Sequence, residues 1–335
     1  MNIILSKTQL RITALWAFSE ALLGGILHGF HIPFTGLILS AFATVCMAAL
    51  TLQDHQRGKI LKATILVIIV KAVLSPHTPP TAYFAVFLQG AFGELIFSSG
   101  LPYKVSCWCN GIFALLQTAF QKLLVLTILF GMDLWHAIDA FMKSAMQQMG
   151  VNNTSFSYYI VGVFILLHLI AGIIAGTFAA RLPKFMQSEG NKILVSHKII
   201  PQTETTTNIK RKTILSRPLS WLLFLFLMTA LYKMYFGPEF ENVIESKVLK
   251  LMIRATLLMA LWYYFISPVL LKWFRKWIMR QKNKFTSEVE DILLLIPEMK
   301  QLTAQSWVQS AGSKGFRRIN KFLSLTFYSL VTYSK

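Results

Sequence analysis

Apolar positions along this chain are grouped in long blocks that are separated by short polar turns. Up to residue 180 all but one of these blocks reach the roughly 20 residues that an α-helix needs to cross a hydrocarbon core about 30 Å thick, the block before Pro76 being shorter. The pattern therefore predicts six membrane helices, at about 12–30, 33–52, 60–75, 81–99, 105–131 and 156–180. A segment with an amphipathic first part, 133–155, lies between the last two of them.

Hydropathy changes after residue 185, and the change predicts a second module. Residues 186–216 are polar and rich in Thr, as expected of a cytoplasmic linker. Beyond it, apolar blocks predict membrane helices at about 218–236 and 249–271, followed by amphipathic cytoplasmic helices. Pro297 is expected to kink or restart one of these helices. The last apolar run, 322–333, is too short for an upright crossing and reads as interfacial or as a truncated span.

The predicted fold is therefore all-α, with three parts. Residues 1–185 form a six-helix membrane bundle, 186–216 a linker, and 217–335 a module with two membrane helices and a basic cytoplasmic region. Composition agrees with this fold, because 55% of the residues are hydrophobic and only 14% are charged. Soluble domains carry about a quarter of charged residues.

Charge distribution predicts the orientation. The net charge is +19, and basic residues cluster just after apolar runs, for example at 57–62, 181–184 and 272–284. Such clusters mark cytoplasmic loops, so we expect a multi-pass cell-membrane protein with a cytoplasmic amino terminus. The same clusters favour membrane lipid as a partner and argue against nucleic acid.

Catalytic signatures are missing from the sequence. It contains no G-x-S-x-G, no H-E-x-x-H and no phosphate-binding G-x-x-x-x-G-K-[ST] loop. We therefore expect that the protein is not an enzyme and has no catalytic residues and no cofactor. If it transports a substrate uphill, the energy must come from a partner or an ion gradient. Cys46, Cys107 and Cys109 are expected to be reduced, inert thiols.

Polar side chains converge toward the outer side of the predicted bundle. Ionisable groups inside a membrane usually face a bundle interior or a wet cavity, so they predict a pocket for a small polar or anionic molecule. Its candidate residues are His28, His31, Lys71, His77, Gln89, Gln121 and Lys122. The alternative is that both lysines snorkel to the interface and the histidines are ordinary loop residues. No metal site is predicted, because an H-x-x-H spacing alone is a weak signal.

Small residues follow one stripe of the first helix, centred on Ala17 and Ala21. Small residues at this spacing let helices approach closely in lipid. The stripe is therefore either a docking face for a partner membrane subunit or internal packing, and the two readings are equally supported. Glu20 lies beside it near mid-membrane and needs a partner, which Lys71 or a glutamine could provide.

These features resemble the substrate-binding S component of energy-coupling factor transporters, over about residues 8–185. Ala17-Phe18-Ser19-Glu20-Ala21 matches the family's Ala-x-x-x-Ala element, and Leu27-His28-Gly29-Phe30-His31-Ile32-Pro33-Phe34 its first outer loop. The resemblance implies capture of a small-molecule substrate, with a T-type membrane subunit and separate ATPase subunits as partners.

A second resemblance covers about residues 215–335. Leu293-Leu294-Leu295-Ile296-Pro297-Glu298-Met299 and the polar helix after it are similar to the cytoplasmic coupling region of the T component. That region carries Ala-Arg-Gly or Ala-Arg-Ser elements, and here Ala304-Gln305-Ser306 has glutamine in place of arginine. It implies that Pro297 and Gln305 belong to a partner-docking region.

The leading hypothesis is a membrane uptake protein energised by separate ATPase subunits. The alternative is a membrane scaffold or assembly protein, whose basic tail 272–335 binds a cytoplasmic partner or lipid.

Overall fold

The computed structural model describes residues 5–25, 34–53, 56–75, 78–147, 156–189, 229 and 247–332. Throughout these residues the regular structure is helical and no strand occurs, which confirms the all-α prediction. Of the helix predicted at 218–236, only residue 229 is among the described residues.

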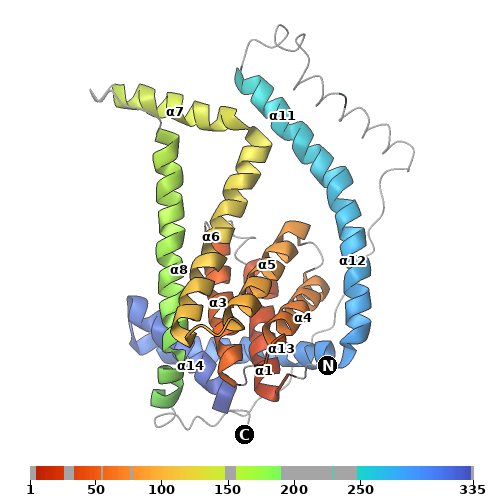
Figure 1. Ribbon diagram of the computed structural model, residues 1–335, viewed down its shortest axis with the longest axis vertical. Coiled ribbons are helices and arrows are strands. Elements are labelled where there is room, and N and C mark those ends of the chain that lie inside the picture. The colour runs from red at the N-terminus through yellow and green to blue at the C-terminus, as the bar shows by residue number, and fades with distance from the viewer. Residues whose placement is uncertain are drawn as a thin grey trace. The chain divides into compact units, whose positions relative to one another are not determined.

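The first helices form close to the positions that the apolar blocks predict, although the first of them begins at Lys7 and not near residue 12 (Figure 1). They are α1 (Lys7–Phe18), a π-helical turn η1 (Ser19–Leu23), α3 (Thr35–Gln53), α4 (Lys59–Leu74), α5 (Pro80–Phe97) and α6 (Tyr103–Phe130). Helix α1 starts with a capping box, in which Ser6 Oγ accepts from the Gln9 amide and the Gln9 side chain accepts from the Ser6 amide.

The remaining helices include one that contains a proline. They are α7 (Met132–Gln147), α8 (Phe156–Glu189), α11 (Lys247–Leu261), the π-helical turn η2 (Trp262–Ile266), α12 (Ser267–Lys284), α13 (Thr286–Gln309), the short η3 (Ser310–Gly312) and α14 (Gly315–Thr332). Helix α13 does not restart at Pro297 but runs across it. Ile292, Ile296 and Met299 are buried along α13, and this packing offsets the backbone hydrogen bond that proline removes.

Four helices of the described chain are long and apolar enough to span a membrane, at Thr35–Leu52, Tyr103–Phe130, Ser157–Lys184 and Ile253–Leu270. The finding supports a membrane protein, as the sequence predicts. The predicted number of six spans goes further than this finding. Three of these predicted spans are not among the four. Helices α1 and α4 are short, with 12 and 16 residues, and α5 contains the polar residues Gln89 and Glu94.

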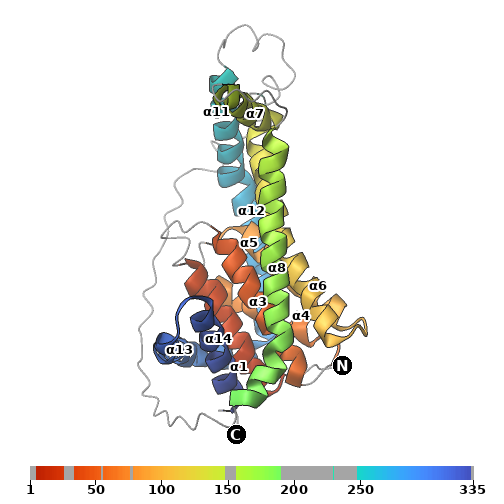
Figure 2. The ribbon, with the colours of Figure 1, turned by 90° about the vertical axis from the view of Figure 1, so that its left-hand side faces the viewer.

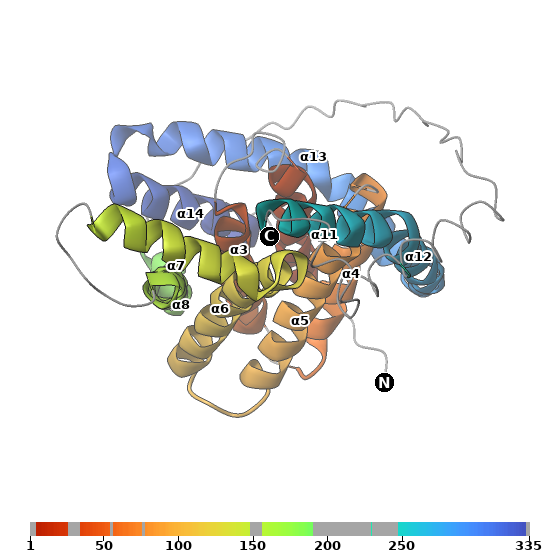
Figure 3. The ribbon, with the colours of Figure 1, turned by 90° about the horizontal axis from the view of Figure 1, so that it is seen from above.

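Contacts divide the chain into two compact units. Unit 1 comprises residues 1–119, 166–202 and 277–335, and unit 2 comprises 120–165 and 203–276. In unit 1, α1 lies against α3 and α4, and α13 packs on both α1 and α4. Figures 2 and 3 show α13 and α14 side by side, with α14 also contacting α1. The last two helices are thus part of the same core as the amino-terminal ones.

The last apolar run of the chain contributes to this core. Leu325, Phe327 and Leu330 of α14 are buried, and the Phe327 ring lies 6.1 Å from that of Phe42 on α3. An apolar run too short to span thus serves as the inner face of an amphipathic packing helix.

Within unit 1, α6 and α8 approach through glycines. A Cβ on Gly111 would lie 2.6 Å from the Gly172 carbonyl oxygen, and one on Gly176 would lie 2.7 Å from the Cys107 carbonyl oxygen. Because Gly172 and Gly176 are four residues apart on one face of α8, they let the two backbones touch.

Unit 2 contains the amphipathic segment that the sequence predicts, as helix α7. Asp139 of α7 accepts hydrogen bonds from the Ser157 amide at 2.6 Å and the Ser157 hydroxyl at 2.9 Å. This carboxylate therefore satisfies a free N–H in the first turn of α8. Arg254 of α11 lies against Gly131 and 3.8 Å from Asp133.

Candidate functional site: a buried charged pair and a polar cluster

The most unusual contact in unit 1 is an ion pair inside its apolar core. Lys71 Nζ donates to Glu20 Oε2 at 2.7 Å, and the two side chains are only 7% and 4% exposed. Glu20 comes from η1 and Lys71 from the last turn of α4, two elements that pack against each other. The predicted need of Glu20 for a partner is confirmed, and Lys71 is that partner.

The backbone around Glu20 departs from a regular α-helix. Residues 19–23 form a π-helical turn directly after α1, and the Ser19 hydroxyl donates to the Trp16 carbonyl at 2.8 Å. Single π-turns inside α-helices are rare and occur frequently at functional sites.

Burying two charges in an apolar environment costs several kcal/mol per ion before their attraction is counted. Replacing such a pair by apolar residues is often neutral, whereas removing one partner is strongly destabilising. Stability alone therefore gives no reason to place Glu20 and Lys71 here, and a functional role is the simpler explanation. The alternative interpretation is that the Lys71 side chain extends to the membrane interface. In the structure its ammonium group is instead buried and paired with the Glu20 carboxylate.

A second polar group joins α3, α5 and α6. Gln89 Nε2 donates to Ser40 Oγ at 2.9 Å and to Gln117 Oε1 at 3.0 Å. Ser40 Oγ also lies 2.8 Å from Thr118 Oγ1. We call Ser40, Gln89, Gln117 and Thr118 the polar cluster. Its hydroxyl and amide groups can exchange their present bonds for bonds to a polar ligand.

Close to Gly93 of α5, Asn110 of α6 is fully buried. Its Nδ2 lies 3.9 Å from the Met47 sulfur, a weak acceptor, and its Oδ1 has no hydrogen-bond partner in the described structure. A buried carbonyl oxygen without a partner costs about 1–3 kcal/mol. Asn110 thus adds an unsatisfied acceptor to the interior of the bundle.

Glu94 has a structural role that the sequence analysis missed. Its carboxylate accepts from the backbone amides of Gly58, Ile60 and Leu61 at 2.5, 3.1 and 3.2 Å. Ser98 Oγ adds a fourth hydrogen bond at 2.8 Å. The carboxylate thus caps the first turn of α4, where its charge also favours the helix dipole.

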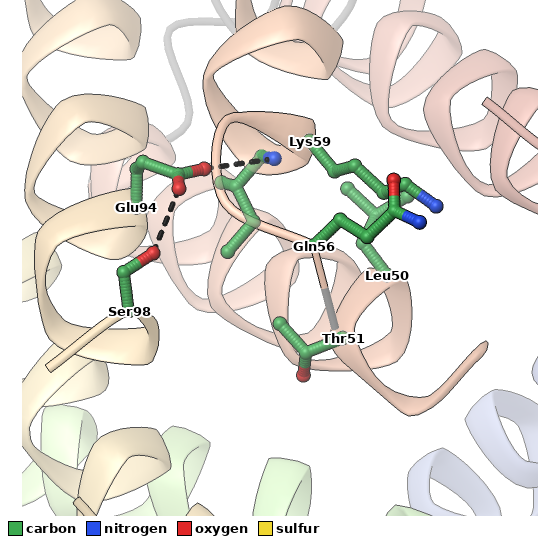
Figure 4. Close-up of a pocket in the computed structure, with 7 residues that line it drawn as sticks. Leu50, Thr51, Gln56, Lys59, Glu94 and Ser98 are labelled. Atoms are coloured by element: carbon green, nitrogen blue, oxygen red, sulfur yellow. Dashed lines mark hydrogen bonds between the residues drawn. The ribbon is translucent and has the colours of Figure 1, made fainter. Parts of the chain in front are cut away.

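A small pocket adjoins this cap. Figure 4 shows Glu94 and Ser98 on one side, with Gln56 and Lys59 on the other. Its free space is about 10 Å³, which is room for a single water molecule. The pocket is too small for an organic substrate.

Of the predicted substrate residues, the structure places Lys71 in the charged pair and Gln89 in the polar cluster, and the others lie in unit 2 or outside the described residues. His28, His31 and His77 lie outside the described residues. Gln121 and Lys122 belong to unit 2, where Lys122 is exposed, whereas Lys71 and Gln89 belong to unit 1. Across the described ranges no group of three His, Cys, Asp or Glu side chains could hold a metal ion.

The small residues of the first helix face inward. Ala17 and Ala21 are both buried by the protein's own helices. This burial favours the reading of the stripe as internal packing, which the sequence left open beside a docking face.

Helix α13 is attached to the bundle by two ion pairs that the sequence analysis did not identify. Arg11 of α1 donates to Glu298 at 2.6 Å, and Lys62 of α4 donates to Glu288 at 2.7 Å. Burial alone raises the pKa of the Glu288 carboxyl, but the hydrogen bond and charge of Lys62, with the Glu288 amide and Ser287, hold that pKa below its usual value. These partners are more than 200 residues apart, so no local pattern pairs them.

The side of α13 that points away from the buried Ile292, Ile296 and Met299 is exposed and partly apolar. Leu294 and Val308 are 78% and 70% exposed, and the predicted docking residues Pro297 and Gln305 are exposed too. Their spacing of three, eight and three residues places all four on one side of a helix. We call Leu294, Pro297, Gln305 and Val308 the outer face of α13.

Comparison of the chain with protein-family models, with curated proteins and with solved structures gives no match.

Proposed function

We propose that the protein is the membrane component of an uptake transporter, which captures a small polar or anionic molecule and is energised by separate ATPase subunits. The observation that carries the proposal is the Lys71–Glu20 pair, buried in an apolar bundle beside a π-helical turn. Intramembrane ionisable residues typically mark the path of a substrate or an ion.

The buried groups offer a way to bind such a molecule. An anionic ligand competes with Glu20 for the Lys71 ammonium, and a polar ligand exchanges hydrogen bonds with Gln89 and Ser40 of the polar cluster. In either case the ligand takes over hydrogen bonds that the protein's own side chains make in its absence. These polar groups were already removed from water when the protein folded, so ligand binding does not have to desolvate them again. Such a site discriminates by charge and hydrogen-bond pattern.

Helix α13 suits a role in coupling. Its ion pairs to Arg11 and Lys62 connect it to α1, which continues into η1, and to α4, which carries Lys71. A force on α13 thus reaches both elements that hold the charged pair. In this proposal α13 and the amino terminus lie in the cytoplasm, and the outer face of α13 docks on an ATPase subunit or a T-type membrane subunit.

The experiment is purification of the full chain from membranes, with mass spectrometry of the associated small molecules and subunits. It is repeated with Glu20→Leu combined with Lys71→Met, which removes both charges and keeps the core apolar. Glu290→Gln combined with Lys300→Met is the matched control, because both side chains are exposed on α13.

A transporter component should retain a small molecule in the wild type and the control but lose it in the Glu20/Lys71 variant. ATP-hydrolysing subunits should co-purify with all three proteins. Co-purification of subunits without any small molecule would favour the scaffold alternative. If neither subunits nor a small molecule co-purified, the proposal would be refuted.

A further inference from the structure

The carboxyl-terminal end of one membrane helix carries an unusual concentration of positive charge. Residues 253–270 are long and apolar enough to span a bilayer, and the chain continues through η2 and α12 without leaving the helix. From residue 272 to 284 the sequence contains six basic residues and no Asp or Glu, namely Lys272, Arg275, Lys276, Arg280, Lys282 and Lys284.

Two of these cations form a defined surface just past the span. Lys272 and Lys276 are four residues apart, so they lie one turn apart on the same face of α12, and both are exposed. Neither makes an ion pair with any residue that the structure describes, since the four described pairs involve other cations. Their charge is therefore available to a partner.

An apolar stripe runs beside this basic face. Trp273 is 69% exposed, and Val269, one turn earlier on the same side of the helix, is exposed as well. Tryptophan is enriched where a membrane helix meets the headgroup layer, because its ring is apolar and its N–H is polar. Trp273 stands between Lys272 and Lys276 directly after the apolar span, the level at which a lipid leaflet passes from acyl chains to glycerol and phosphate.

We propose that this surface, Val269, Trp273, Lys272 and Lys276, binds the headgroup of an anionic phospholipid in the leaflet where the 253–270 span ends. Lys272 and Lys276 pair with the headgroup phosphate, while Trp273 and Val269 pack on the glycerol and the first methylenes. A basic cluster directly after a membrane helix is the known pattern for attraction to anionic lipids. An acidic protein partner could pair with the two lysines, but it would not explain why the apolar side chains beside them are exposed.

The test uses the full chain in neutral detergent and counts bound lipids by native mass spectrometry during titration with phosphatidylglycerol or phosphatidylcholine. We expect the wild type to prefer phosphatidylglycerol. Lys272→Gln combined with Lys276→Gln should weaken that binding about 25-fold, roughly fivefold per lysine. Lys272→Arg combined with Lys276→Arg should retain it, and this pair of variants separates loss of charge from misfolding.

The matched control is Lys314→Gln combined with Lys321→Gln, which removes two exposed lysines near and in α14. It should leave phosphatidylglycerol binding within about twofold of the wild type. Equal affinity of the wild type for both lipids would overturn the proposal. So would equal losses in the α12 and control variants, because net charge alone would then explain the binding.

Discussion

Lys62 of α4 and Glu288 of α13 are joined by a 2.7 Å hydrogen bond between ammonium and carboxylate, although 226 residues separate them in the chain. The Lys62 ammonium also lies 5.3 Å from the centre of the Phe285 ring, just before α13 begins. One lysine at the start of α4 thus holds the first turn of α13 by charge and by a cation–π contact.

We predict a pH dependence of this attachment. Since the pKa of Glu288 is lowered in the folded protein, its ion pair contributes stability above the ordinary carboxyl pKa of about 4.3. That contribution is lost as the pH falls through the lowered value. The difference in unfolding free energy between the wild type and Glu288→Gln should therefore be constant above about pH 5 and vanish in stronger acid. Glu290→Gln is the control, and a difference that persists in acid would contradict the prediction.

The charged pair should behave very differently in single and double variants. Lys71→Met leaves a buried carboxylate without its cation and should cost about 3–5 kcal/mol of stability. Adding Glu20→Leu removes that carboxylate and should restore most of the loss, because the site is then apolar. Thermal unfolding of the purified protein in detergent measures both. A double variant no more stable than Lys71→Met would show that the two side chains do not act as a pair.

Contact between α6 and α8 should make Gly111 intolerant of even one methyl group. A Cβ at residue 111 meets the backbone of α8, so Gly111→Ala should destabilise by about 1–3 kcal/mol. Gly162 of α8 has open space around it, and Gly162→Ala should stabilise by about 0.5–1 kcal/mol through helix propensity. Unfolding measurements on the two variants, which make the same chemical change, test the contact directly. A stabilised Gly111→Ala would contradict it.

The outer face of α13 should matter for partner binding and not for folding. Leu294→Lys combined with Val308→Lys puts charge on two exposed side chains, so stability should change by less than about 0.5 kcal/mol. Capture of any cytoplasmic subunit should be lost, because a charge buried in an interface without a partner is costly. Ile319→Lys, which puts a charge on an exposed apolar position of α14, serves as the control for added positive charge. Undiminished capture by the double variant would place the docking surface elsewhere.

The sequence by itself determined the local properties of this protein. Block length and hydropathy depend only on neighbouring residues. They predicted the approximate positions of α3, α4, α5, α6 and α8, and the apolar runs at 33–52, 105–131, 156–180 and 249–271 that are long enough to span. Glu20 could be recognised as needing a partner, because a lone acid in an apolar helix is costly in any fold. Lys71 was one of the two kinds of partner that the sequence offered, beside a glutamine, and the structure pairs it with Glu20.

Only the tertiary structure decided which helices meet. In the folded protein Ala17 and Ala21 are buried, and the Ser40 and Thr118 hydroxyls are hydrogen-bonded. Helix α13 forms ion pairs with Arg11 and Lys62. A hydropathy pattern reports how apolar a face is but not which surface covers it. The final run 322–333 is an example. Its amphipathic pattern would be the same whether its apolar face packed on lipid or on α1, and in the structure α14 contacts α1. Packing, ion pairs and glycine contacts depend on three-dimensional proximity between residues far apart in the chain, and such proximity leaves no local signal.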